Sequence, residues 1–193
     1  MKYQTKQITK CTQSGFTLIE LIIALAIGII TMTIAIPSFL TTIQNSHLTT
    51  ETNKLVADIN LARSEAIKRS ADVWICGSAN PSAAAPVCAG STTWTTGWLL
   101  FIDDNGDNAF AAADDTLIRI GNAQASGSSV KFISTANTLT YTAEGILSTG
   151  SATFVVAICD DRGTSEGRQV QVNPTGRPRL VKTIGSCTVP VAA

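Results

Sequence analysis

The sequence of 193 residues lacks the residue sets on which the common enzyme mechanisms depend. It has a single histidine, His47, and no G-x-S-x-G, H-E-x-x-H or phosphate-loop pattern. We interpret His47 as a solvated surface residue rather than a ligand or a catalytic base. The sequence therefore predicts a protein that is not an enzyme and that needs neither a cofactor nor a metal ion.

Charged residues are also scarce, at 15% of the chain against about 25% in an average soluble protein. The formal net charge is zero, but the two signs are separated along the sequence. Five aspartates lie between residues 103 and 115, whereas Glu166 is the only acidic residue after Asp161 in the basic C-terminal part. The net charge therefore says little about partners, because the two charged stretches present different surfaces.

The N-terminus joins a basic segment to a long apolar run. Residues 2–15 carry three lysines and no acidic residue, and residues 16–36 are long enough to cross a bilayer as a helix, for which about 20 residues suffice. In an ordinary secretory signal the apolar region precedes the cleavage site, whereas here it follows the basic segment. We expect cleavage after Gly15 to leave the helix on the mature chain, with the lysines on the cytoplasmic side.

Glu20 is the one charged residue in this apolar run. A carboxylate at that depth costs about 3 kcal/mol on insertion scales, so it needs a partner or a use. Cleavage creates a positive α-amino group on Phe16, and we expect this group to pair with Glu20, within one chain or between neighbouring chains. Between chains, the pair would set the axial register of the subunits. The alternative is a glutamate that snorkels to the membrane interface.

Beyond Pro37 the helical pattern continues to about Ser70, and we expect this second half to pack on a sheet. Its apolar stripe consists of Leu48, Leu55, Ile59, Ala62 and Ala66. Short β-type runs separated by turn residues follow, at 73–76, 98–102, 117–120, 130–133, 139–142, 153–159, 168–172 and 179–183. The predicted fold class is α+β, with a long N-terminal helix packed on antiparallel sheet. We expect Trp94 and Trp98 to lie in its core.

Four cysteines follow the basic N-terminal segment, which itself contains Cys11. They are Cys76, Cys88, Cys159 and Cys187. Four cysteines allow three pairings, and the spacing favours Cys76–Cys88 and Cys159–Cys187. The absence of a C-x-x-C pair argues against a zinc ribbon. Disulfides predict an oxidising compartment, here the bacterial periplasm or the cell surface.

The segment 103–108, with sequence DDNGDN, suggests calcium at first sight. An EF-hand loop places glycine sixth, and counting back from Gly106 puts Phe101 at the first ligand position, so the match fails. Asn105-Gly106 is instead a strong turn dipeptide. We therefore interpret this segment as an acidic turn rather than a metal site.

The N-terminal features together resemble the class III signal of type IV pilins and type II secretion pseudopilins. The resemblance rests on the lysine-rich leader, Gly15, the sequence Phe16-Thr17-Leu18-Ile19-Glu20, and the long helix with Gly28 and Pro37. It implies a pilin-like fold, cleavage between Gly15 and Phe16 by prepilin peptidase, and methylation of the new N-terminus. It also implies that Glu20 pairs with a neighbour's N-terminal amine in a filament.

A second feature is the basic C-terminal hairpin. The sequence 173–176, Asn-Pro-Thr-Gly, predicts a tight turn, and Arg177 and Arg179 follow it, separated by Pro178. In an extended segment, residues two apart project from the same side, about 7 Å apart. That spacing is near the phosphate spacing along one DNA strand. We expect Lys182 and Arg168 to extend the basic surface, and the Cys159–Cys187 disulfide to hold it rigid.

The residues Gly176-Arg177-Pro178-Arg179 also fit the G-R-x-R motif of FimT-like minor pilins in the GspH/FimT family, whose members bind DNA during natural transformation. Further similar segments are 62–69 (ARSEAIKR), 76–98 and the 173–176 turn, so the resemblance covers nearly the whole chain. It implies weak, non-specific binding of double-stranded DNA through its phosphates. The DNA-binding residues it implies are Gly176, Arg177, Arg179, Lys182 and Arg168.

The predicted organisation is a removable leader at 1–15, a hydrophobic helix at 16–42 and a periplasmic globular domain at 43–193. The chain would sit in the bacterial inner membrane through one helix and then enter a pilus with other pilins. Two alternatives remain. One is a structural minor pilin or type II secretion pseudopilin that primes assembly without binding DNA, and the other is a pilus-tip adhesin for another anionic polymer.

Overall fold

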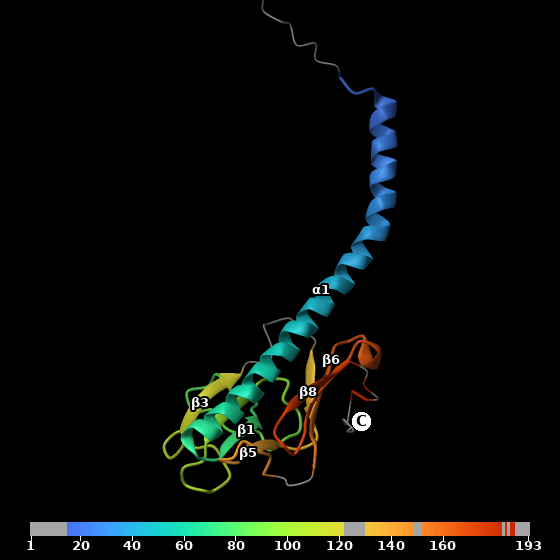
Figure 1. The fold of residues 1–193 in the computed structure, drawn as a ribbon. Helices are drawn as coiled ribbons and strands as arrows, with labels where there is room; N and C mark the ends of the chain where they lie inside the picture. The colour runs from blue at the N-terminus through green and yellow to red at the C-terminus, as the bar shows by residue number, and fades with distance from the viewer. Residues whose placement is uncertain (1–14, 122–129, 149–151, 183, 185, 188–193) are drawn as a thin grey trace, which may run out of the picture. The chain divides into compact units, whose positions relative to one another are not determined.

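The computed structural model describes residues 15–121, 130–148, 152–182, 184 and 186–187 (Figure 1). The leader up to residue 14, with Cys11, lies outside these residues. The chain divides into two compact units, Met1–Ile43 and Gln44–Ala193, and helix α1 (Leu18–Arg69) contributes to both.

In the first unit, α1 is a single apolar helix whose side chains are exposed, among them Leu18 at 76% and Phe39 at 69%. Among the described residues it is the one helix long and apolar enough to cross a membrane. None of its apolar window is buried within the chain, unlike the core helix of a soluble protein. This exposed surface needs a bilayer or the helices of other subunits to cover it.

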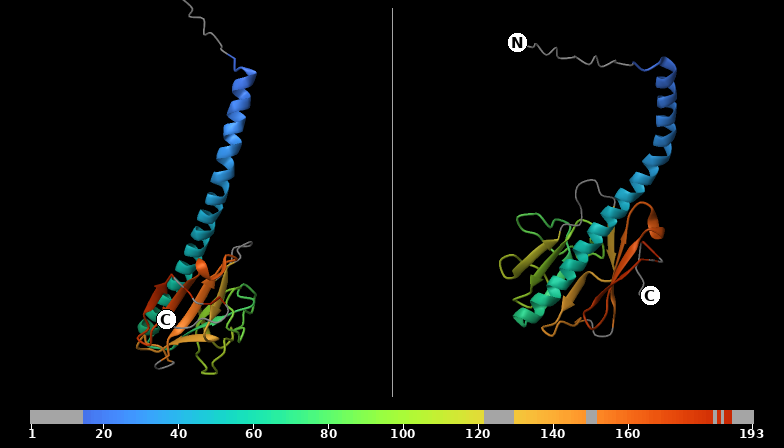
Figure 2. Two further views of the ribbon diagram at one scale, coloured as in Figure 1. Left: turned by 90° about the vertical axis from the view of Figure 1, so that its right-hand side faces the viewer. Right: turned by 45° about the horizontal axis from the view of Figure 1, so that its top comes forward.

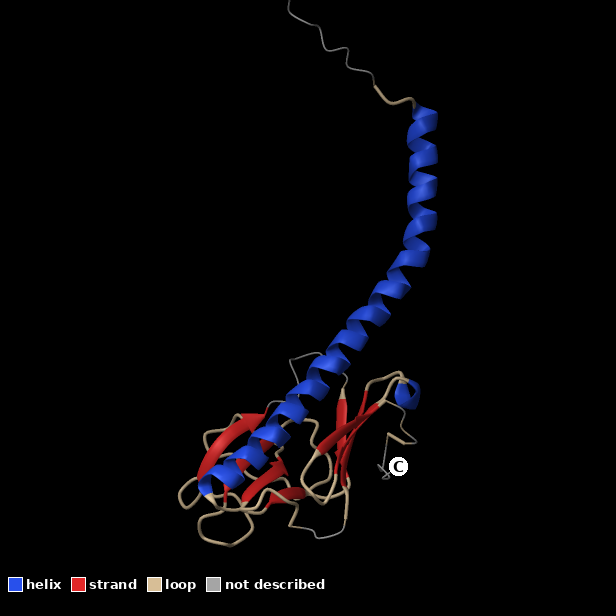
Figure 3. Cartoon of the chain, viewed as in Figure 1, coloured by secondary structure: helices blue, strands red, loops and turns tan. Residues whose placement is uncertain are grey.

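The second unit contains two antiparallel four-stranded sheets (Figure 3). Sheet A has the order β3-β2-β1-β5 and sheet B the order β4-β6-β7-β8. The strands of sheet A are β1 (Val73–Gly77), β2 (Trp98–Ile102), β3 (Thr116–Gly121) and β5 (Thr138–Tyr141). Those of sheet B are β4 (Lys131–Ser134), β6 (Phe154–Cys159), β7 (Arg168–Val172) and β8 (Pro178–Val181), with the short 3-10 helix η1 (Gly163–Ser165) between β6 and β7.

These elements confirm the predicted α+β fold class and all eight predicted strands, with bounds that differ by two residues at most. The division of the strands between two sheets is a finding of the structure. Figures 1 and 2 show strand β3 on one side of the helix and strands β6 to β8 on the other. The helix therefore spans the junction between the sheets rather than the face of one sheet.

One hydrophobic core joins the helix stripe to the inner faces of both sheets. Leu55 and Ile59 are fully buried, and Trp98 packs against Phe132 with ring centroids 5.5 Å apart. Trp94 likewise packs against Phe154, at 5.4 Å. The predicted core positions of the helix and of both tryptophans are thus confirmed, and His47 is exposed as expected.

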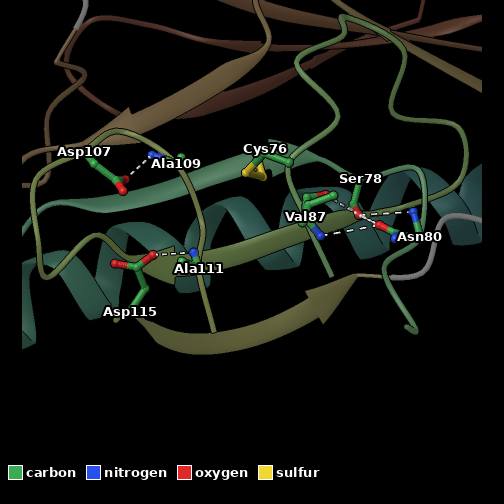
Figure 4. The surroundings of a disulfide bond; sticks show 9 residues. Cys76, Ser78, Asn80, Val87, Asp107, Ala109, Ala111 and Asp115 are labelled. Atoms are coloured by element: carbon green, nitrogen blue, oxygen red, sulfur yellow. Dashed lines mark hydrogen bonds between the residues drawn. A yellow bond between two sulfur atoms is a disulfide. The ribbon is translucent and has the colours of Figure 1, made fainter. Parts of the chain in front are cut away.

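The two predicted disulfides are present. Cys76 and Cys88 have Cα atoms 5.6 Å apart, and Cys159 and Cys187 have theirs 6.0 Å apart. Figure 4 shows the first in its surroundings, where Ser78 Oγ donates to the carbonyl of Val87 at 2.8 Å. This disulfide and this hydrogen bond close the loop between β1 and β2 on the outer face of sheet A.

The acidic stretch forms the connection between β2 and β3, and its carboxylates cap the loop's own backbone. The carboxylate of Asp103 accepts from the N–H groups of Gly106, Asp107 and Asn108. Asp115 accepts from the N–H of Ala111 at 2.6 Å, as Figure 4 shows. The described residues contain no group of three acidic, histidine or cysteine side chains placed to hold a metal ion. The carboxylates of Asp103 and Asp115 therefore stabilise the connection between β2 and β3 through its own backbone.

Candidate functional site

The predicted turn at 173–176 joins β7 to β8 at the edge of sheet B. The N–H of Gly176 donates to the carbonyl of Asn173 at 2.7 Å, and the N–H of Asn173 donates to the carbonyl of Arg177 at 3.2 Å. Pro174 supplies the fixed φ that the second turn position requires. The local sequence therefore determines a tight turn that places Arg177 immediately before the edge strand β8.

Arg177 and Arg179 are both exposed beside this turn. Among the residues that the structure describes, no acidic side chain forms an ion pair with either of them. Pro178 between them begins β8, where the missing N–H costs nothing because β8 is an edge strand. Both guanidinium groups are thus available to an anionic partner.

Register separates the other predicted basic residues from this pair. Arg179 lies opposite Gln171, close to the turn. The paired part of β7 and β8 ends, away from the turn, where Gln169 lies opposite Val181. Arg168 and Lys182 lie just beyond that second end. Both are available to solvent, half-exposed and exposed respectively, but they lie at the opposite end of the strand pair from the turn, and their part in a basic surface with the arginine pair stays a prediction.

The Cys159–Cys187 disulfide, expected to hold the basic surface rigid, lies near Arg168 and not near the turn that carries Arg177, so its support of the arginine pair stays an untested prediction. Strand β6 pairs with β7 so that Ile158 lies opposite Arg168 and Phe154 lies opposite Val172. Cys159 is therefore at the Arg168 end of sheet B, and Arg177 follows the turn at the other end. The disulfide instead ties the C-terminal segment, through Ile184, to the outer face of this sheet.

The turn is held by residues that sequence reasoning did not assign to the site. Arg63 on helix α1 donates from Nε to the carbonyl of Gly145 at 2.9 Å and from Nη2 to that of Thr175 at 3.1 Å. The buried hydroxyl of Tyr141 donates to the carbonyl of Gly176 at 3.0 Å. Burial raises the pKa of Tyr141, although the charge of Arg63 opposes this, so the phenol keeps its proton and remains a donor. The only sequence signal was that Arg63 lies in the ARSEAIKR stretch.

Two further polar contacts attach the helix to the sheets. Trp98 Nε1 donates to Asp58 Oδ2 at 2.8 Å, and Arg119 Nε lies 3.0 Å from Asp58 Oδ1. Burial raises the pKa of Asp58, while Trp98 and Arg119 lower it. On the sheet B side, Arg162 donates to Asn45 Oδ1 at 2.8 Å. The helix is therefore fixed to both sheets along its length in the second unit.

At the N-terminal site, Gly15, Phe16 and Glu20 are all exposed. Thr17 precedes the first helical residue, and its hydroxyl accepts from the N–H of Glu20 at 3.3 Å. This is the threonine half of a capping box, and the Glu20 carboxylate in the first turn also favours the positive end of the helix dipole. Glu20 therefore has a local use in helix initiation, and its pairing with a neighbour's amine stays a prediction.

Comparison with known proteins gives two family matches. Residues 51–176, more than half of the chain, match the model described as type II transport protein GspH, and residues 10–36 match the prokaryotic N-terminal methylation motif. No curated protein matches the chain.

Two crystal structures of the type IV minor pilin FimU from Pseudomonas aeruginosa strain PAO1 are similar to it at 22% identity and a TM-score of 0.55. The similarity covers 72% of this chain and 98% of the other in one crystal form, and 74% and 96% in the second. At this level of identity, the likeness to FimU establishes the fold alone.

An exposed N-terminal helix with a methylation motif, continued into a domain of two antiparallel sheets, defines a structural, non-enzymatic protein of the pilin class. Its helix and motif are consistent with an inner-membrane prepilin. Within that class, the chain belongs to the GspH family of minor pilins and pseudopilins.

Proposed function

We propose that this chain is a FimT-like minor type IV pilin that binds double-stranded DNA through Arg177 and Arg179 during natural transformation. The observation that carries the proposal is the exposed pair of arginines, which have no acidic partner among the described residues. The turn beside them is held by hydrogen bonds from the backbone, Arg63 and Tyr141. Guanidinium groups bind phosphate with two parallel hydrogen bonds, so the pair suits a phosphate backbone.

Contacts of this kind carry no sequence information, because they reach phosphates and not base edges. Two to four cations also release few counterions, so binding by one copy is weak and falls steeply with salt. Several copies near one filament end would raise the overall affinity through avidity. The acidic loop at 103–115 keeps the DNA to the β8 side of the domain.

The same proposal includes maturation at the N-terminus. Prepilin peptidase cleaves between Gly15 and Phe16, and the new N-terminus is methylated. The chain stays anchored in the inner membrane until it is assembled into the pilus with other pilins. The match of residues 10–36 to the methylation motif supports this sequence of steps. Arg177 and Arg179 lie in the other unit, so DNA binding and maturation are separable properties.

The test is Arg177→Ala/Arg179→Ala in the full chain, solubilised in a neutral detergent and titrated with a short DNA duplex at several salt concentrations. We expect affinity to fall roughly 10- to 100-fold and the salt slope to decrease by about 1.8, the value for two lost phosphate contacts. Transformation should fall while pili still form. Lys68→Ala/Arg69→Ala is the matched control, because it removes the same charge from side chains already paired with Glu65.

Full DNA affinity in the double arginine variant would contradict the proposed site. A different outcome is that the parent chain binds no DNA and that the double arginine variant no longer forms pili. In that case the arginines belong to a contact between subunits. The chain would then be a structural minor pilin or a type II secretion pseudopilin, to which the printed description of the family model also points. Equal loss of binding to dextran sulfate and to DNA would favour an adhesin for anionic polymers.

A further inference from the structure

The turn at 173–176 has a hydrogen-bond donor on each of its four carbonyl groups. The carbonyl of Asn173 accepts a hydrogen bond from the N–H of Gly176 at 2.7 Å, and the carbonyl of Pro174 accepts one from the N–H of Leu147 at 3.0 Å. The remaining two carbonyls accept hydrogen bonds from side chains. Arg63 donates to the carbonyl of Thr175, and Tyr141 donates to the carbonyl of Gly176. Surface turns commonly leave such groups to water, so this one is tied to its surroundings to an unusual degree.

Arg63 is the centre of this arrangement because it joins three segments that are far apart in sequence. Its planar guanidinium spans the carbonyls of Gly145, 82 residues away, and Thr175, 112 residues away. A lysine carries one ammonium group and cannot present this flat two-donor fork. The fork holds the β5–β6 connection and the turn against helix α1 at the same time.

Gly176 is required by the same arrangement. Its φ is +79°, in the region that favours glycine. A Cβ at this position would lie 2.2 Å from the carbonyl oxygen of Gly145 and 3.1 Å from Arg63 Nε. A side chain here would therefore push apart the groups that Arg63 holds together, immediately before Arg177.

We infer that Arg63 is a positioning residue of the DNA interface, which orders the 173–176 turn so that Arg177 and Arg179 are presented in a fixed geometry before DNA arrives. This inference rests on the proposed function. A preordered turn lowers the entropy lost on binding and so raises affinity without adding a contact. Arg63 acts through the backbone, because its Nε and Nη2 point at carbonyl groups of the protein.

The experiment compares Arg63→Gln and Gly176→Ala with the parent, as full chains in neutral detergent. Each variant should bind the duplex roughly fivefold more weakly, the factor for reordering the backbone of about one residue. The salt slope should stay at the parent value, because the number of phosphate contacts is unchanged. Amide exchange should quicken at residues 173 and 175–177, whereas Arg69→Gln, which removes the same charge from the same helix, should change none of these properties.

Arg63→Lys separates positioning from direct contact, since it keeps the charge and loses the fork. We expect it to bind as weakly as Arg63→Gln. Full affinity in Arg63→Lys, with a salt slope lowered by about 0.9 in Arg63→Gln, would make Arg63 a phosphate contact and overturn the inference. A second outcome is that Arg63→Gln and Gly176→Ala bind DNA as tightly as the parent, while Arg177→Ala/Arg179→Ala loses binding. This would overturn the inference about Arg63 and leave the proposed function intact. If the double arginine variant binds as the parent does, the proposed function fails, and amide exchange still reports whether Arg63 orders the turn.

Discussion

At the scale of single residues, Asp160 and Arg162 form an ion pair that is supported by several hydrogen bonds. Arg162 donates to Asp160 Oδ2 from Nη2 at 2.6 Å and from Nε at 3.0 Å, and its backbone N–H donates to Oδ1 at 3.0 Å. Burial raises the pKa of Asp160, but the hydrogen bonds and charge of Arg162 outweigh burial and lower the pKa overall. The pair therefore favours the charged carboxylate in the folded chain.

This direction determines the pH dependence of the free energy of unfolding. Because the folded pKa lies below the unfolded one, the contribution is complete above about pH 4 and is lost as pH falls through the lowered folded pKa. We expect Asp160→Asn to cost about 1–3 kcal/mol at pH 7 and to show a shallower loss of stability from pH 5 to pH 2. Urea unfolding followed by tryptophan fluorescence measures both, with the exposed Asp161→Asn as the control. A parent-like pH profile in Asp160→Asn would contradict this assignment.

At the scale of elements, helix α1 depends on its apolar stripe for its place in the second unit. Ile59 is fully buried between the two sheets, while Ile67, two turns later, is 52% exposed. The polar contacts of Asp58, Arg63 and Asn45 orient the helix, but buried area supplies most of the favourable free energy. The two isoleucines therefore allow a matched comparison on one helix.

We expect Ile59→Ala to lower the free energy of unfolding by about 2–5 kcal/mol, because it leaves a cavity under the helix. Ile67→Ala should cost only about 0.5 kcal/mol. The measurement is the same urea titration, with the denaturant slope checked for two-state behaviour. Equal costs at the two sites would show that the stripe does not hold the helix as the structure describes.

At the scale of the whole molecule, the two disulfides stabilise different sheets and close loops of different length. Cys76–Cys88 spans 12 residues on sheet A, and Cys159–Cys187 spans 28 residues on sheet B. In the chain-entropy account, the longer loop restricts the unfolded chain more. Because Arg63 and Tyr141 donate hydrogen bonds to the arginine turn, we expect neither disulfide to be needed for its shape.

Replacing either pair by alanine should cost about 2–5 kcal/mol, with Cys159→Ala/Cys187→Ala costing about 0.7 kcal/mol more than Cys76→Ala/Cys88→Ala. Guanidinium unfolding of both variants gives the comparison. DNA affinity should stay at the parent value in both, since Arg63 and Tyr141 hold the turn. A loss of affinity confined to the Cys159 and Cys187 variant would restore the disulfide as the support of the arginine pair.

Much of the fold was predictable because its signals are local. The helix stripe has a period that one segment reveals, the strands alternate with turn residues, and Asn173 to Gly176 carry their own turn chemistry. Both disulfides followed from the spacing of four cysteines. The candidate arginines were also visible, because exposed charges beside a turn form a compact sequence pattern.

The sequence by itself determined an apolar N-terminal helix, eight strands, and a basic turn at the end of the chain, since each depends on residues close together. Only the tertiary structure decided which residues support that turn. Arg63, Gly145 and Thr175 meet through contacts that span 82 and 112 residues, and the strand register moves Cys159 and Arg168 to the other end of the sheet. Such contacts depend on how the sheets pack against the helix, and no local period or spacing encodes that packing.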